Sequence, residues 1–243
     1  MTLILLLLGI LPGFVWLLFY LEEDTDHEPM REVFFAFLIG SAITIIVLFT
    51  EQLYAALGNI IGIAPYSFIS FLGLSSIEEF FKFAAAYLVV SKSRYFDIPV
   101  DAMIYMVVVA LGFATLENIF AVSGEFKNAA ALSSAAETAS LRFVGATLLH
   151  TLASATVGYY WAKAMTHGSW VKNLVTGLSL ATGLHTVFNY LVSVEGVSII
   201  YPVILLTVAG FFVLNDFDKL KHPEKLGVAP FFKKRVGAQA DMV

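Results

Sequence analysis

The chain has 243 residues, of which 59% are hydrophobic and 14% charged, and its mean hydropathy is +0.83. This apolar fraction is well above that of an ordinary globular domain and predicts a membrane protein. The formal net charge of -5, without a basic surface, excludes nucleic-acid binding, and the absence of cysteine excludes disulfides, thiolate metal sites and cysteine nucleophiles.

Seven apolar segments are long enough to cross a bilayer as helices, which takes about 20 residues. The first has no basic stretch before its apolar run, so we expect a retained span rather than a signal peptide. The sequence therefore predicts an all-α, polytopic transmembrane helix bundle of about seven spans. In chain order, the segments are residues 2–21, 32–57, 65–90, 99–123, 139–165, 171–193 and 197–215.

Lysine and arginine are distributed unevenly over the segments that connect these spans. With the N-terminus outside, eleven of them fall in cytoplasmic segments and one, Lys127, falls in an external loop. The positive-inside rule therefore predicts that the N-terminus is outside and the C-terminus inside. We expect one transmembrane domain over residues 1–216 and a basic cytoplasmic tail over residues 217–243, in a multi-pass protein of the cytoplasmic membrane.

Ionisable side chains within spans cost a few kcal/mol to insert, so each of them is a candidate functional residue. Four predicted spans carry such groups. Counted along the helices at about 1.5 Å per residue, one group from each span lies roughly 9–21 Å below the outer surface. The polar residues are Glu78, Glu79 and Lys82 in the third span, Glu117 and Asn118 in the fourth, His150 in the fifth, and His185 and Asn189 in the sixth.

Helical spacing indicates which of these groups share a face. Lys82 lies four residues after Glu78 and three after Glu79, so we expect the lysine to pair with one of the two carboxylates and to leave the other available for chemistry. Asn189 lies four residues after His185, where its amide could hold the imidazole ring or a substrate carbonyl.

Each polar residue taken alone also has a structural explanation. Buried ion pairs, packed histidines and interhelical asparagine hydrogen bonds all hold helices together. Glu51 lies near a span end, where water can reach it, and Asp101 is typical of a helix N-terminus facing the cytoplasm. Arg142 fits an interfacial anchor that reaches for lipid headgroups. The agreement in depth between four helices nevertheless favours one shared site.

Glutamate and histidine side chains together are typical of a hydrolytic site. Imidazole nitrogens and carboxylate oxygens are the ligands of a catalytic zinc, and a further glutamate can act as general base on water. The same residues permit a metal-free protease in which a buried glutamate activates water and Asn189 stabilises the oxyanion. They also permit a proton- or cation-coupled transporter, although no internal repeat is present, or a non-catalytic chaperone or receptor.

Four ordered motifs resemble the PrsW family of intramembrane proteases, which are distantly similar to the CAAX-processing and bacteriocin-processing membrane proteases. The sequence EEFFK, with Glu78, Glu79 and Lys82, resembles the family's EExxK motif, and FATLEN, with Glu117 and Asn118, resembles FxxxEN. The third motif is matched by His150 in LLHTLASATVGYY, and HTVFN, with His185 and Asn189, is similar to HxxxN.

The resemblance implies an intramembrane endopeptidase that cleaves membrane-anchored, single-span substrates, such as anti-sigma factors, at an extracytoplasmic site-1 position. The catalytic candidates are Glu78, Glu79, Glu117, His150, His185 and Asn189, with Lys82 and Asn118 in support. We expect a divalent metal, most simply zinc, held by Glu79, Glu117, His150 and His185. We expect a loop over residues 124–138, which are small and polar.

Overall fold

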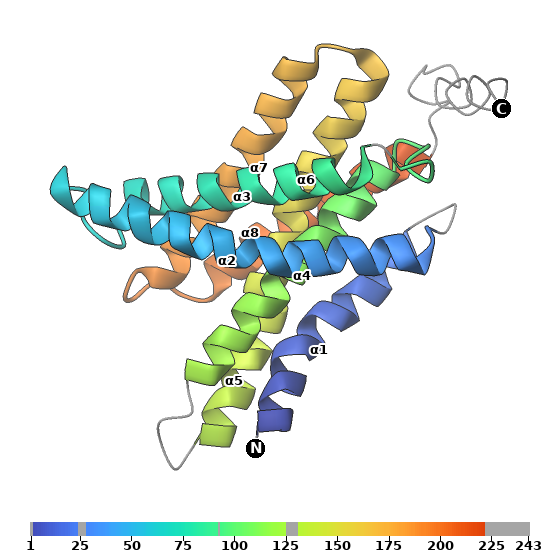
Figure 1. Cartoon of the computed structure of the whole chain (residues 1–243). Coiled ribbons are helices and arrows are strands. Elements are labelled where there is room, and N and C mark those ends of the chain that lie inside the picture. Colours follow the sequence, from blue (N-terminus) through green and yellow to red (C-terminus); the bar gives the residue numbers. More distant parts are fainter. Residues whose placement is uncertain (1, 24–27, 92, 125–130, 222–243) are drawn as a thin grey trace, which may run out of the picture.

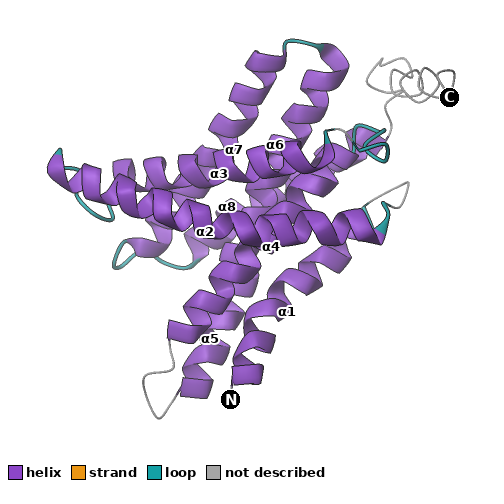
Figure 2. Ribbon diagram, viewed as in Figure 1, coloured by secondary structure: helices purple, strands orange, loops and turns teal. Residues whose placement is uncertain are grey.

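The computed structural model describes residues 2–23, 28–91, 93–124 and 131–221. This part of the chain contains eight α-helices and no β-strand (Figure 2). The helices are α1 (Thr2–Leu21), α2 (Met30–Ile60), α3 (Phe68–Val90), α4 (Asp101–Gly124), α5 (Ala131–Val144), α6 (Ala146–His167), α7 (Trp170–Ser193) and α8 (Ile200–Lys221). The predicted all-α architecture is confirmed.

Helix α4 forms the centre of the bundle. Every residue from Asp101 to Thr115 is buried, because α1, α2 and α6 pack around this helix. Figure 1 shows α2 beside α3 and α6 beside α7, each pair running as an antiparallel hairpin. An apolar helix that is buried on all sides is typical of the core of a membrane bundle.

Small residues allow α2 to approach α4 closely. A Cβ atom added to Gly112 would lie 2.0 Å from the carbonyl oxygen of Phe37, and one added to Gly40 would lie 2.1 Å from that of Val109. The two backbones are thus in direct contact, as small residues permit between membrane helices. The Ser41 hydroxyl donates a hydrogen bond of 2.9 Å to the carbonyl of Gly112.

Two expectations about the fifth span are wrong. Residues 139–165 do not form one uninterrupted helix, since Gly145 breaks the helical path between α5 and α6 with φ -103° and ψ -91°. Of the predicted loop over residues 124–138, residues 131–138 form the first turns of α5 instead, and residues 125–130 lie outside the described residues. The alanines of α5 are good helix formers, and Ala135 and Ala139 pack against Val122 of α4.

Three helices, α2, α4 and α8, are long and apolar enough to cross a membrane. A further apolar stretch, Leu6–Leu21, covers most of α1. These helices support an integral membrane protein, whereas the number of spans and their orientation stay predictions. Helix α8 continues to Lys221, beyond the predicted end of the last span, and residues 222–243 of the expected tail lie outside the described residues.

Candidate active site

Helix α3 carries three charged residues into the middle of the bundle. Its start is capped by Ser67, whose hydroxyl oxygen accepts a 3.2 Å hydrogen bond from the backbone N–H of Ser70. Glu79 and Lys82 are completely buried and Glu78 is 6% exposed. Charges at this depth require partners, because an isolated buried charge costs several kcal/mol.

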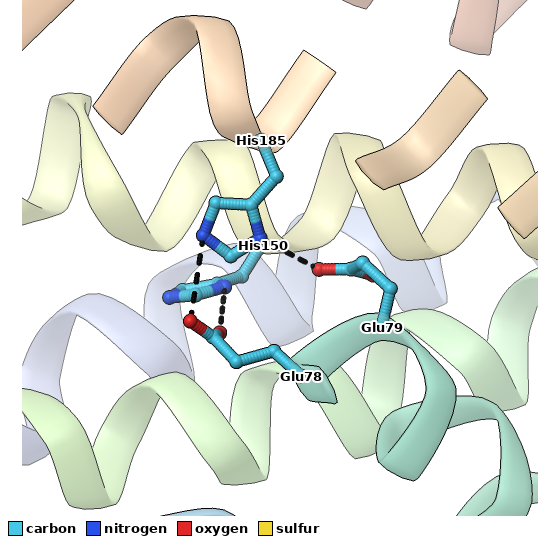
Figure 3. Close-up of side chains that lie close together, drawn as sticks. All are labelled: Glu78, Glu79, His150 and His185. Atoms are coloured by element: carbon cyan, nitrogen blue, oxygen red, sulfur yellow. Dashed lines mark hydrogen bonds and ion pairs between the residues drawn. The ribbon is translucent and has the colours of Figure 1, made fainter. Parts of the chain in front are cut away.

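The partners come from two helices that are distant in sequence. His150 of α6 and His185 of α7 are both buried, and their rings meet edge to face with centroids 5.0 Å apart. Figure 3 shows both imidazoles above the carboxylate of Glu78, with the carboxylate of Glu79 beside them. The structure therefore brings together four of the residues that the sequence singled out.

The ammonium group of Lys82 lies among these side chains. Its Nζ atom is 3.0 Å from Glu78 Oε2, 2.9 Å from Glu79 Oε1 and 2.8 Å from His150 Nδ1, and it lies 4.3 Å from the centre of the Phe113 ring. The expectation that Lys82 pairs with one carboxylate and leaves the other free is wrong. The three donors of an ammonium group let one lysine bridge positions i-3 and i-4 together.

Each histidine has one ring nitrogen hydrogen-bonded to a carboxylate. His150 Nε2 lies 2.8 Å from Glu117 Oε2, and His185 Nδ1 lies 2.9 Å from Glu79 Oε1. The other nitrogen of each ring faces Glu78: His150 Nδ1 is 3.7 Å from Oε2, and His185 Nε2 is 3.7 Å from Oε1 (Figure 3). A carboxylate on the far side of a ligating histidine is the usual arrangement around protein-bound zinc.

The donor set fits a divalent metal. Ligand atoms of Glu78, Glu79, His150 and His185 all lie within 4.8 Å of one another. Neighbouring ligands of a tetrahedral zinc with bonds of 2.0–2.1 Å are about 3.4 Å apart. The two 3.7 Å separations between the imidazole nitrogens and Glu78 are close to this value. The residues present therefore have the ligand types that a divalent metal accepts, and two of their separations are near those of a tetrahedral site.

Glu117 lies beside this group and is bound by a cation that the sequence analysis assigned to the lipid interface. Arg142 Nη2 donates a 3.1 Å hydrogen bond to Glu117 Oε2, and Arg142 Nε donates one to Asn118 Oδ1. The expectation that Arg142 reaches for headgroups is wrong, because a guanidinium gains more from a carboxylate and an amide within reach. Asn118 is fully buried and contacts Arg142 rather than the histidines.

Two further residues at the site were missed. The Glu51 side chain of α2 is half-buried and lies close enough to Glu78 for the two carboxyl groups to interact, although its position near a span end had suggested contact with water. The Ser154 hydroxyl donates a 3.3 Å hydrogen bond to Glu79 Oε2. Its place four residues after His150, on the same helix face, was the available sequence signal.

Two residues that the sequence made candidates lie outside the cluster of glutamates and histidines. The side-chain amide of Asn189 is half-buried and makes no hydrogen bond within the described part of the chain, so the one-turn spacing from His185 does not produce a hydrogen bond between the two side chains. Asp101 is buried at the start of α4, where its Oδ2 atom accepts 2.8 Å hydrogen bonds from the N–H groups of Asp97 and Ile98. It is a helix-start residue, as expected.

Comparisons with known proteins agree with the motifs. A family model described as "PrsW family intramembrane metalloprotease" matches residues 28–214. Protease PrsW of Geobacillus kaustophilus is 34% identical over 157 residues, which are 64% of each chain. Protease PrsW of Clostridioides difficile is 27% identical over 97% of this chain and 99% of its own, and that of Bacillus subtilis is 28% identical over 88% and 94%. No solved structure matches the chain.

Proposed function

The chain belongs to the PrsW family of intramembrane metalloproteases and is an intramembrane protease, and we propose that it hydrolyses peptide bonds of membrane-anchored, single-span proteins with a divalent metal, zinc. One observation carries this proposal. The two histidines each use one ring nitrogen to contact a carboxylate and direct the other at Glu78.

We assign the metal to His150 Nδ1, His185 Nε2 and Glu78, which leaves a fourth position for water. Glu117 and Glu79 then hold the far nitrogens of the two rings. The sequence had suggested Glu79 and Glu117 as ligands, and the geometry favours Glu78 in their place. When bound, the metal supplies Lewis acidity, which activates water and polarises the scissile carbonyl.

Glu79 is the side chain to which we assign the proton transfers. Glu79 Oε2 accepts a long hydrogen bond of 3.3 Å, from Ser154, and is our candidate for the general base. It takes a proton from the attacking water as the oxygen adds to the carbonyl carbon. The proton is then given to the leaving amine as the C–N bond breaks, so that one water is consumed and the products are a carboxylic acid and an amine.

Lys82 occupies the carboxylate oxygens and the imidazole nitrogen that a metal would also bind. Its ammonium lies within 3.0 Å of Glu78, Glu79 and His150, so a metal held there would displace it. The same position supports a second candidate, a metal-free protease in which Lys82 holds the two carboxylates and one of them activates water.

The membrane setting completes the proposed function. The whole bundle would span the cytoplasmic membrane about seven times, with the N-terminus outside, the protease domain over residues 1–216 and the tail in the cytoplasm. Cleavage would then take place in the outer half of the bilayer. Anti-sigma factors cut first at an extracytoplasmic position are the substrate class that we propose, on the motif resemblance.

Cleavage of a tagged single-span substrate in membranes tests the function. We expect the variants His150→Ala and His185→Ala to lose cleavage, and the matched control His167→Ala, which alters an exposed histidine, to retain it. Chelation should stop the wild-type enzyme and zinc should restore it. If cleavage survived chelation and also survived His185→Ala, the metal mechanism would be refuted. If cleavage survived chelation but was lost in His185→Ala, the metal-free protease would be favoured.

A further inference from the structure

Arg142 forms a fork between two consecutive residues of α4. From the last turn of α5, its Nη2 atom donates to Glu117 Oε2 at 3.1 Å and its Nε atom donates to Asn118 Oδ1. Its side chain is 24% exposed, so three quarters of it is covered by protein. A planar guanidinium with fixed donors holds two acceptors in one geometry, which the flexible ammonium of a lysine cannot do.

The oxygen that Arg142 binds is also the oxygen that binds the site histidine. Glu117 Oε2 lies 2.8 Å from His150 Nε2. An acceptor at this position places the ring proton on Nε2 and leaves the lone pair on Nδ1, the nitrogen that faces Lys82 and Glu78, which is the tautomer that a metal bound at Nδ1 requires. The side chain of Glu117 is itself 22% exposed, so it needs an anchor to stay turned toward the ring rather than toward water.

Asn118, which accepts the second hydrogen bond of the Arg142 guanidinium, is itself held in place. Its Nδ2 atom donates a 3.0 Å hydrogen bond to the hydroxyl of Thr147, and both residues are completely buried. Thr147 lies in the first turn of α6, one turn before His150. The guanidinium is therefore tied to α6 by two routes, through Glu117 to the histidine and through Asn118 to the start of the same helix.

We propose that Arg142 is a positioning residue for the metal site, which acts through Glu117 to hold His150 in its ligating tautomer and orientation. This role rests on the proposed metal function. It predicts an effect on metal binding that an anchor for lipid headgroups would not have. Replacement of groups outside the ligand shell typically weakens metal affinity or activity by about 10–100-fold.

Zinc affinity of the purified full-length protein, measured by competition with a chromophoric chelator, provides the test. We expect Arg142→Gln to weaken zinc binding about tenfold, the lower end of that range, because the residue acts at one remove from the ligand. Arg142→Lys should recover part of the affinity, since an ammonium can reach one acceptor but not both. Added guanidinium should restore zinc binding to Arg142→Ala, and Arg94→Gln, which alters an exposed arginine paired with Tyr95, is the matched control.

The outcomes separate this role from the metal function. Wild-type protein that binds one zinc, with Arg142→Gln binding it equally well, would overturn the role of Arg142 and leave the metal site intact. Wild-type protein that binds no zinc would overturn both. Thermal unfolding of each variant distinguishes a general folding defect from a local one, and rescue of Arg142→Ala by guanidinium requires a folded site, so it supports the role directly.

Discussion

Replacing Glu78 and Glu79 one at a time by glutamine separates a metal ligand from a general base. Both carboxylates contact Lys82, but they differ in their other contacts. Glu78 directs one oxygen at each imidazole across 3.7 Å, whereas Glu79 accepts hydrogen bonds from His185 and Ser154. The two variants have nearly the same shape and lose the same charge, so a difference between them reports on role rather than on packing.

The expected magnitudes follow from those contacts. Glu78→Gln removes one of three protein ligands, so zinc binding should weaken by more than the roughly 10–100-fold that is typical of groups outside the ligand shell. Glu79→Gln keeps an amide oxygen for the N–H of His185, so zinc affinity should fall within that range. Its single-turnover rate of cleavage should fall by about 10²–10⁴-fold, because the general base is lost.

Zinc titration and single-turnover cleavage of a tagged substrate, carried out on the same preparations, measure both quantities. Glu137→Gln, which alters an exposed glutamate of α5, is the matched control. If Glu79→Gln lost zinc while Glu78→Gln retained it, the two roles would be exchanged. If both variants retained zinc and cleavage, neither carboxylate would belong to the mechanism.

Three other substitutions test the packing and the charges. Gly112→Ala places a methyl group 2.0 Å from the Phe37 carbonyl oxygen and should destabilise the bundle by about 1–3 kcal/mol in thermal unfolding. Gly210→Ala, which has open space around it, should not destabilise the bundle. Equal melting points of the two variants would contradict the backbone contact. Lys82→Met removes the ammonium that both buried carboxylates contact, so the metal-free protein should lose about 3–5 kcal/mol and regain stability with zinc. Unchanged stability without zinc would refute this. Asn189→Ala should change kcat by about twofold or less, since the amide has no hydrogen bond among the described residues; a loss of a hundredfold would return the amide to the oxyanion role.

The sequence determined where the helices lie and which polar residues they carry. Runs of about 20 apolar residues can satisfy their backbone hydrogen bonds in a membrane as helices, so each of the seven predicted segments contains a helix. Charged residues in such segments are costly, which is why the Glu, Lys and His positions stood out. Helical spacing also placed Lys82 within reach of either glutamate, because that relation holds within one helix, but the contact with both at once was not predicted.

The tertiary structure decided every relation between helices. Three relations depend on the rotation and depth of separate helices. Arg142 contacts Glu117, Glu51 approaches Glu78, and both histidines face Glu78. Those are set by packing, such as the backbone contact at Gly112, and no spacing along one helix encodes them. The separate helix α5 was missed for a related reason: its alanines favour a helix without forming a long apolar run, and its place is fixed by contacts with its neighbours.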